Sequence, residues 1–226
     1  MTQFSFLNFY KLTNQWYNRD EESKHRAFSD LATYLANFKN CQTYIYLTHY
    51  FRNDTDFLLW NISETIEQVK IFERRFRKLE LYKYLSLPYK YFSITKESKY
   101  LKEHKHQGQT NDDRTKIDVI GKKYLFVYPF TKKREWYKLP EEVRFSMMKE
   151  HFTIGHKYPN IKIHTTYCYG LHDYEFILIF ESDSIEQFLE LVEELRFSQA
   201  SQYTLIDIPI FTCEKITPIE LVKEFT

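Results

Sequence analysis

The sequence predicts an α+β protein made of two ferredoxin-like βαββαβ halves, whose antiparallel sheets pack as an α+β barrel. Two observations lead to this fold class. Segments rich in aromatic and β-branched residues alternate with amphipathic helical segments, and the order of these segments in the first half recurs in the second half. The residues recur as well, because positions 57–68 align with 176–187 without a gap at an offset of 119 (176 minus 57).

The first half is expected to begin with a strand, continue with a helix and then alternate further strands with a second helix. Residues 22–38 carry apolar side chains at spacings of three and four, so one face of this first helix would cover a sheet. The strands are short aromatic or β-branched runs bounded by polar turn residues. They are expected at 4–12, 42–50, 56–60 and 90–94, and the second helix is expected to open at Ser63.

The second half repeats this order. Its first helix, residues 140–154, has Pro140 at its start and Glu141 and Glu142 in its first turn. We expect it to end at Gly155, since glycine readily adopts the positive φ that often ends a helix. The remaining strands are expected near 123–130, 161–169, 174–181 and 203–212, and the second helix near 184–196.

A polar linker separates the halves. Residues 102–118 contain almost no apolar side chains that could anchor them to a core. The chain therefore divides into an N-terminal half over 1–101, a linker over 102–118 and a C-terminal half over 119–226. His104 and His106 lie in the linker, where two histidines in a solvated loop are more often free of metal than ligands of it.

The composition excludes several classes of function. With 32 basic and 31 acidic residues, no net charge favours nucleic acid or an anionic membrane as partners. Only four glycines are present, so the sequence contains neither of the two common glycine-rich motifs that bind phosphate. Aromatic residues make up 19% of the chain, which suits β-sheet and could also line a large flat apolar pocket.

The cysteines and the apolar runs indicate a cytoplasmic protein. Cys41, Cys168 and Cys213 are scattered and odd in number, so neither a disulfide framework nor a structural zinc site is expected. The first residues lack the basic region and long apolar run of a signal peptide. Nothing later approaches the roughly 18 apolar residues of a membrane span.

Two histidines of the second half stand out by position. In the helix over 140–154, His151 falls on the same stripe as Val143, Met147 and Ile154, so it should point inward as either a hydrogen-bonded core histidine or a ligand. In the following strand, alternation puts His164 with Thr166 and Cys168, opposite Ile163 and Thr165. The offset of 119 relates His151 and His164 to Ala32 and Ile45, which bind no metal, so any such site belongs to the second half alone.

The chain resembles the coproheme decarboxylases within the chlorite dismutase-like family. The resemblance rests on residues 128–134 (Tyr-Pro-Phe-Thr-Lys-Lys-Arg), followed by 136–140 (Trp-Tyr-Lys-Leu-Pro) and 148–151 (Met-Lys-Glu-His). Residues 195–197 in the second half, and 57–60 and 84–89 in the first half, also match, and the resemblance extends over about residues 4–213. It implies two ferredoxin-like halves that form a barrel, a ring of five subunits, and one haem in the C-terminal half.

The resemblance also implies roles for individual residues. His151 matches the proximal histidine that binds the haem iron, and Tyr128 matches a tyrosine beside a propionate that carries a radical in decarboxylation. Lys132 matches the lysine next to that tyrosine, and a redox-active phenol beside a cation suits chemistry on a carboxylate. Arg196 and Ser201 match positions near the propionates, where arginine can bind a carboxylate with two hydrogen bonds.

The sequence departs from the family pattern on the distal side. His164 matches the distal position, which is arginine in true chlorite dismutases and glutamine in many coproheme decarboxylases, while another branch of decarboxylases resembles this chain in having histidine. An imidazole there could move a proton during peroxide cleavage, whereas the guanidinium that would hold a chlorine oxyanion is missing, so chlorite dismutation is disfavoured. The loop from Arg134 to Trp136 is shorter than in the decarboxylases, and Ser198 stands where an acidic residue is usual.

These observations lead to one main hypothesis and two alternatives. The main hypothesis is a haem-dependent oxidoreductase of haem biosynthesis, in which coproheme is both substrate and cofactor and hydrogen peroxide drives decarboxylation to haem b. The partners are then a porphyrin, peroxide and further copies of the chain, with a pentamer expected from the resemblance. The alternatives are a non-catalytic haem-binding or haem-sensing protein and a weak haem peroxidase.

Overall fold

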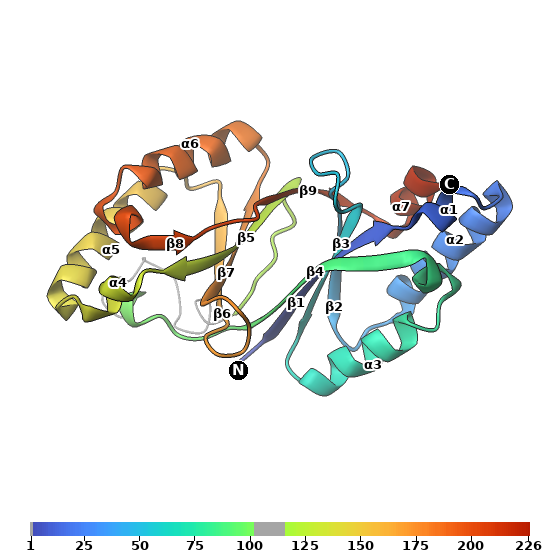
Figure 1. Ribbon diagram of the computed structural model, residues 1–226, viewed down its shortest axis with the longest axis horizontal. Helices are drawn as coiled ribbons and strands as arrows, with labels where there is room; N and C mark the ends of the chain where they lie inside the picture. The colour runs from blue at the N-terminus through green and yellow to red at the C-terminus, as the bar shows by residue number, and fades with distance from the viewer. Residues whose placement is uncertain (1, 102–115) are drawn as a thin grey trace. The chain divides into compact units, whose positions relative to one another are not determined.

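The computed structural model describes residues 2–101 and 116–226, so His104 and His106 lie outside the described residues (Figure 1). Contacts between Cα atoms divide the chain into two compact units. The last fifteen residues, which the sequence-based division assigns to the second half, belong to the first unit. The first unit contains Met1–Phe92 and Thr212–Thr226, and the second contains Ser93–Phe211.

The first unit is built on one largely antiparallel sheet. Its strands are β1 (Phe4–Leu12), β2 (Gln42–Leu47), β3 (Phe57–Ser63), β4 (Leu85–Ile94) and β9 (Phe211–Ile216). They lie in the order β4-β1-β3-β2-β9, in which β1 and β2 each pair antiparallel with β3, and β9 pairs antiparallel with β2. The expected strand over 42–50 ends earlier, at Leu47, because Thr48 and His49 turn the chain and donate their backbone N–H groups to the carbonyl of Asp56.

Two helices cover one face of this sheet, α2 (Glu21–Asn37) and α3 (Ile66–Phe76) (Figure 1). The helix α2 begins where the Asp20 side chain accepts a hydrogen bond from the Ser23 N–H at 2.8 Å. The helix α3 begins after Thr65, whose hydroxyl accepts from the Gln68 N–H. The expected start at Ser63 is therefore wrong, because Ser63 still belongs to β3 and its hydroxyl donates to the Thr65 carbonyl.

A single apolar core lies between these helices and the sheet. Phe28 and Leu31 of α2 and Phe72 and Phe76 of α3 are fully buried. They form one continuous cluster with side chains from β1, β2 and β3. The short helix α1 (Asn14–Tyr17) adds the buried Trp16 to this cluster. The helix-covered side of the first sheet is thus packed with apolar side chains.

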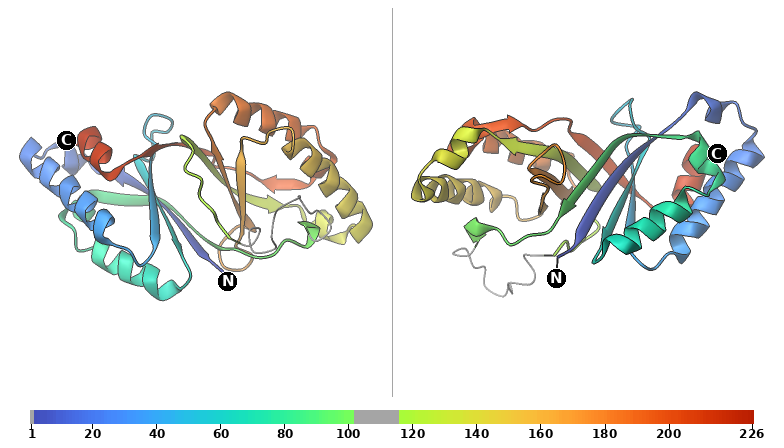
Figure 2. Two further views of the ribbon diagram at one scale, coloured as in Figure 1. Left: turned by 180° about the vertical axis from the view of Figure 1, so that it is seen from behind. Right: turned by 60° about the horizontal axis from the view of Figure 1, so that its bottom comes forward.

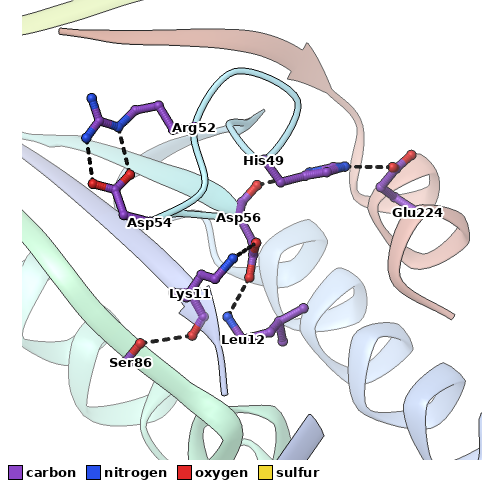
Figure 3. A network of polar contacts seen from close by, with 8 residues as sticks. All are labelled: Lys11, Leu12, His49, Arg52, Asp54, Asp56, Ser86 and Glu224. Atoms are coloured by element: carbon purple, nitrogen blue, oxygen red, sulfur yellow. Dashed lines mark hydrogen bonds and ion pairs between the residues drawn. The ribbon is translucent and has the colours of Figure 1, made fainter. Parts of the chain in front are cut away.

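The C-terminal helix α7 (Pro218–Phe225) packs beside α2, as both views in Figure 2 show. A polar network joins it to the turn between β2 and β3 (Figure 3). In this turn His49 Nε2 lies 3.1 Å from Glu224 Oε1 of α7, and the His49 ring nitrogen Nδ1 lies near the Asp56 carbonyl. The buried Asp56 carboxylate accepts from Lys11 Nζ at 2.9 Å and from the Leu12 N–H at 2.6 Å, which fixes the turn to β1.

The second unit repeats the first. Its strands β5 (Tyr124–Lys132), β6 (Lys162–Tyr167), β7 (Phe176–Ser182) and β8 (Thr204–Ile206) lie in the order β6-β7-β5-β8 and pair antiparallel. The first four strands of the chain have the equivalent order, β2-β3-β1-β4. The helices are α4 (Arg134–Lys138), α5 (Glu141–Gly155) and α6 (Ile185–Arg196), of which α5 and α6 cover one face (Figure 1). The predicted α+β class with two antiparallel βαββαβ repeats is confirmed.

The helix α5 ends at the expected residue, but without the expected positive φ. Gly155 is its last residue, and His156 follows in a right-handed helical conformation with φ of −69°. Positive φ occurs among the described glycines at Gly121 and Gly170. In the described ranges, no helix has the length and apolar character needed to cross a bilayer.

Candidate functional site

The second sheet has two faces that carry different chemistry. Residues directly opposite each other in antiparallel strands project from the same face. Tyr128 of β5 lies opposite Leu178 of β7, which in turn lies opposite Thr165 of β6, so these three share a face. The row of Val127, Ile179 and His164 projects from the other face. The face of Tyr128 is the one that α5 and α6 cover.

His151 lies in the third turn of α5 between two separate groups of buried side chains. Met147, one turn before it, packs in a cluster with Trp136 and Ala200. Ile154, one turn after it, packs in a different cluster with Tyr128 and Phe180. His151 itself belongs to neither cluster and is partly buried. The predicted inward-facing row of Met147, His151 and Ile154 is therefore present. His151 lies between the two apolar clusters.

The imidazole of His151 is neutral at physiological pH. Burial and, to a smaller extent, charge repulsion from the nearby Lys132 ammonium together lower its pKa to about 4. Within the described part of the chain, no protein group forms a hydrogen bond with this ring. The neutral imidazole is the form of histidine that binds a metal ion. The interpretation of His151 as a hydrogen-bonded core histidine has no support in these contacts.

Lys132, the last residue of β5, lies close to His151. Its Nζ is 4.0 Å from the centroid of the Trp136 ring and 5.3 Å from that of Phe130, an arrangement of a cation over aromatic faces. Burial lowers the pKa of Lys132 to about 8, while the carboxylate of Glu175 opposes this shift. The side chain is thus largely charged at neutral pH and only weakly solvated, which suits the binding of a carboxylate.

Tyr128 is buried on the same face and strand. Its ring stacks on Phe180 with centroids 5.6 Å apart and an angle of 15° between the planes. Burial raises the pKa of the phenol well above its ordinary value, although the Arg196 charge opposes the shift. The phenol therefore keeps its proton at all physiological pH values, and it loses this proton readily only together with an electron.

Arg196 and Ser201 lie where α6 ends. The Arg196 guanidinium, about half exposed, forms an ion pair with Asp207. The Ser201 hydroxyl lies 2.7 Å from both the Arg196 carbonyl and the Ser198 carbonyl, so it donates its hydrogen bond to the backbone. Arg196 is close enough to affect the Tyr128 pKa, whereas Ser201 serves to hold the chain after the helix.

The internal repeat shows which of these residues are special to the second unit. The strands β1 and β5 and the helices α2 and α5 begin 120 residues apart (124 minus 4 and 141 minus 21). At this offset Lys132 corresponds to Leu12 and His151 corresponds to Leu31, which corrects the pairing of His151 with Ala32 expected from the offset of 119. Leu12 and Leu31 are both fully or almost fully buried in the core of the first unit. The second unit therefore places a cation and an imidazole where its repeat has apolar core.

His164 does not join this group. It is buried on the opposite face, and its Nε2 lies 2.8 Å from Oε1 of the buried Glu181. Glu181 also accepts hydrogen bonds from the backbone N–H groups of Ile120 and Gly121 at 3.1 and 2.6 Å. Burial raises the Glu181 pKa, but the hydrogen bond from His164 and these N–H groups outweigh it and lower the pKa overall. The geometry thus gives no support to a distal role for His164 and instead makes it part of a structural clamp.

Two polar residues near the site were missed by sequence reasoning. Thr165 is the polar residue that β6 places on the face of Tyr128, and the strand register was needed to find it. Glu175 is buried just before β7, and its carboxylate accepts from the Lys132 N–H at 2.9 Å and from the Tyr137 hydroxyl at 2.5 Å. An acidic residue between the aromatic residues Tyr174 and Phe176 was the available signal.

Comparison with known proteins extends these observations. The family model for chlorite dismutase matches residues 11–216. The chain is 27% identical over 174 residues to the coproheme decarboxylase of Mycolicibacterium smegmatis, covering 76% of this chain and 72% of that protein. It is 29% identical over 198 residues to the coproheme decarboxylase of Staphylococcus saprophyticus, covering 80% and 78%.

Solved structures share the fold over nearly the whole length. A mutant chlorite dismutase from Candidatus Nitrospira defluvii superposes with a TM-score of 0.87 at 18% identity, covering 99% of this chain and 95% of that one. A haem-binding protein from Thermus thermophilus gives a TM-score of 0.88 at 22% identity, covering 100% and 96%. At these identities the likeness concerns the fold alone.

Proposed function

The chain belongs to the chlorite dismutase family, and from this premise we propose that it is a haem-dependent oxidative decarboxylase that converts coproheme to haem b. The single observation that carries the proposal is the neutral imidazole of His151, which has no hydrogen-bonding partner among the described residues and lies beside Lys132 on the sheet face that holds Tyr128. The similarity to two coproheme decarboxylases over most of the chain supports the same reaction.

The residues present fit a planar tetrapyrrole with an iron centre and carboxylate arms. The packing between α5 and the sheet is divided into two clusters, and His151 lies between them. In the first unit, Leu31 and Leu12 occupy the equivalent positions and complete a continuous core. We infer that the bound group takes the place of this missing core. His151 would hold its iron, and Lys132 and Arg196 would hold its propionates.

The chemistry requires the removal of two electrons for each propionate. The change is R–CH₂–CH₂–COO⁻ + H₂O₂ + H⁺ → R–CH=CH₂ + CO₂ + 2 H₂O, in which a C–C bond and a C–H bond break and peroxide takes both electrons. The bound iron supplies the redox chemistry when it is present. Coproheme is then both substrate and cofactor.

The chain's own residues position the propionate and move a proton and an electron. The Lys132 ammonium, held over Trp136, neutralises the carboxylate before the reaction. Tyr128 keeps its phenol proton until an electron leaves the ring, since burial makes the phenolate unfavourable. Stacking on Phe180 keeps this ring in one orientation. Tyr128 is thus suited to relay oxidation to the adjacent propionate.

The β6 residues on the Tyr128 face favour decarboxylation over chlorite dismutation. The strand β6 presents Ile163, Thr165 and Tyr167 to the face of Tyr128, and none of these is a cation that could hold a chlorine oxyanion. Thr165 supplies a hydroxyl that can hydrogen-bond a bound peroxide.

The exposed apolar residues of the second unit support assembly of several copies. Phe197, Leu205 and Ile208 are 83%, 59% and 66% exposed in the isolated chain. Exposed apolar side chains mark a contact surface where they lie together, and these three belong to the segment between α6 and β9. We propose that further copies of the chain cover them, as in a ring of five.

The decisive test follows the porphyrin itself. The purified chain is loaded with coproheme, titrated with hydrogen peroxide, and the extracted porphyrin is measured by mass spectrometry. Two successive losses of CO₂ and two hydrogen atoms, one for each of the two propionates that become vinyl groups, are expected. Tight binding of coproheme and haem b without any mass change would instead indicate a haem-binding or haem-sensing protein. Oxidation of an added phenolic substrate with an intact porphyrin would indicate a peroxidase.

A further inference from the structure

A cavity of about 460 Å³ lies in the first unit, formed by α3 together with β1 and β4. Figure 1 shows these three elements, and all lining residues belong to the first unit. The cavity is therefore separate in the fold from His151 and Lys132, which belong to the second unit. It is lined by Phe6, Ile66, Val69, Lys70, Glu73, Arg74, Arg77 and Lys90.

The internal repeat explains why this cavity exists. In the second unit, Phe126 of β5 stacks on Phe188 of α6 with ring centroids 3.8 Å apart and an angle of 10°. The equivalent residues in the first unit are Phe6, 120 positions before Phe126 (126 minus 6), and Val69, 119 positions before Phe188 (188 minus 69). Valine has no ring to stack, so the space that Phe188 fills in one unit stays open beside Phe6 in the other.

The floor of the cavity is apolar and fixed. Val69 is almost fully buried, at 2% exposure. Phe6 stacks on Phe92 with ring centroids 4.6 Å apart, and Lys90 Nζ lies 5.8 Å from the Phe6 ring centroid. Ile66, in the first turn of α3, completes this floor. An apolar ligand body placed here would bury its surface without displacing core side chains.

The rim of the cavity is positively charged. Four lining residues are cationic and one, Glu73, is anionic, so the lining carries a net charge of +3 (4 minus 1). Glu73 lies 3.0 Å from Lys90 Nζ and 3.6 Å from Arg77 Nε. Lys70 Nζ lies 3.6 Å from Glu67, and both side chains are exposed. Among the described residues, no carboxylate lies within ion-pair distance of Arg74. The charge at Arg74 is thus available to a ligand.

This charge is also specific to the first unit. At the offset of 119, Lys70 corresponds to Leu189 and Arg74 corresponds to Glu193. The repeat that fills the cavity with Phe188 therefore also lacks these two cations. The open space and these two cations therefore occur together in the first unit, and an apolar body with charged groups at its edge is the lining that small-molecule sites commonly have.

We propose that this cavity binds an amphipathic organic anion, with an apolar body against Phe6, Ile66 and Val69 and one oxyanion group at Arg74 and Lys70. Its volume falls in the range of roughly 300–1,000 Å³ that is typical of small-molecule sites. The guanidinium of Arg74 suits a planar oxyanion such as a carboxylate, which it can contact with two hydrogen bonds. The site is independent of the reaction proposed for the second unit.

The test uses a fluorescent pair of probes on the full-length chain. The probe 1-anilinonaphthalene-8-sulfonate has an aromatic body and one sulfonate, and N-phenyl-1-naphthylamine has the same body without the charge. Two variants remove the site by different means. Arg74→Glu reverses a rim charge, and Val69→Phe fills the cavity with the residue found at position 188. Arg75→Glu is the matched control, because Arg75 is next to Arg74 on α3 but lies over the Phe38 ring, outside the cavity.

Saturable binding of the sulfonate probe is expected, with weakening of at least roughly tenfold in both Arg74→Glu and Val69→Phe and little change in Arg75→Glu. The uncharged probe should bind more weakly than the sulfonate and should respond to Val69→Phe but not to Arg74→Glu. Displacement of the sulfonate by decanoate or by decyl phosphate then assigns the preferred oxyanion.

Three results would overturn the proposal. They are the absence of saturable sulfonate binding to the wild-type chain, equal weakening by Arg75→Glu and Arg74→Glu, and unchanged binding in both cavity variants. The titrations are repeated with saturating haem b, which separates binding of the probe at the proposed second-unit site from binding at this cavity.

Discussion

The carboxylate of Glu175 accepts a hydrogen bond from the backbone N–H of Lys132 at 2.9 Å. This contact places a buried negative charge beside the lysine that is proposed to hold a propionate. The same carboxylate opposes the burial that lowers the Lys132 pKa to about 8. Glu175 is thus a positioning residue that keeps Lys132 charged at neutral pH.

Replacement of Glu175 by glutamine should therefore make coproheme binding more sensitive to alkaline pH. Without the carboxylate the Lys132 pKa falls below about 8. As the pH rises, the variant therefore loses its affinity for a carboxylate ligand at a lower pH than the wild type does. The measurement is the coproheme dissociation constant between about pH 6 and pH 9. Lys132→Met is the control and should show a flat profile over this range. Identical profiles for wild type and Glu175→Gln would exclude the role of Glu175.

Tyr128→Phe should separate binding from reaction. The variant keeps the ring that stacks on Phe180 but removes the hydroxyl that is proposed to relay a proton and an electron. Coproheme should bind with unchanged affinity, and peroxide should no longer cause loss of CO₂. Tyr124→Phe is the matched control, since Tyr124 lies on the same strand and face. Normal product formation by Tyr128→Phe would remove Tyr128 from the mechanism.

His164→Ala should affect stability rather than the porphyrin. The change leaves Glu181 as a buried carboxylate without its imidazole partner, and breaking such a pair costs about 3–5 kcal/mol of unfolding free energy. Chemical denaturation measures this loss, and Glu181→Gln should show a similar one. A stable His164→Ala protein with a slowed peroxide reaction would contradict this and support the distal role predicted from the sequence.

The apo chain should lose stability as pH falls from about 6.5 toward 4, because the unfolded His151 binds a proton in this window and the folded one does not. This linkage amounts to on the order of 1–2 kcal/mol by pH 5. His151→Leu, which restores the residue found at position 31, should reduce that pH dependence and stabilise the apo protein. Thermal unfolding at pH 5 and pH 7.5 compares the two, and an equal pH dependence would show that His151 is solvated rather than buried.

The sequence allowed much of the fold and part of the site to be predicted. The repeat at positions 57 and 176 indicated both halves, and antiparallel pairing in the same order confirms them. Tyr128, Lys132 and His151, predicted from the family resemblance, lie on the helix-covered side of one sheet. Their roles in the reaction stay predictions.

The remaining features depend on register, which a single sequence does not determine. Sequence alternation correctly separated His164 from Thr165, but it could not indicate which of the two faces carried Tyr128. That assignment follows from the pairing of Tyr128 with Leu178 and of Leu178 with Thr165. A shift of one residue exchanges the faces of a strand, so the predicted distal residue was the neighbour of the one that shares the Tyr128 face. Glu175 was missed because its role depends on a contact 43 residues away along the chain.

The central claim is that the His151 imidazole binds the iron of a haem in the second unit. Absorbance titration with coproheme tests it most directly, on the wild-type chain, on His151→Ala and on His156→Ala, a control at the exposed end of the same helix. His151→Ala should weaken binding by more than the roughly 10–100-fold that loss of an outer-shell partner costs, and added imidazole should restore the wild-type spectrum. His156→Ala should behave as wild type. An unchanged spectrum and affinity in His151→Ala would contradict the account.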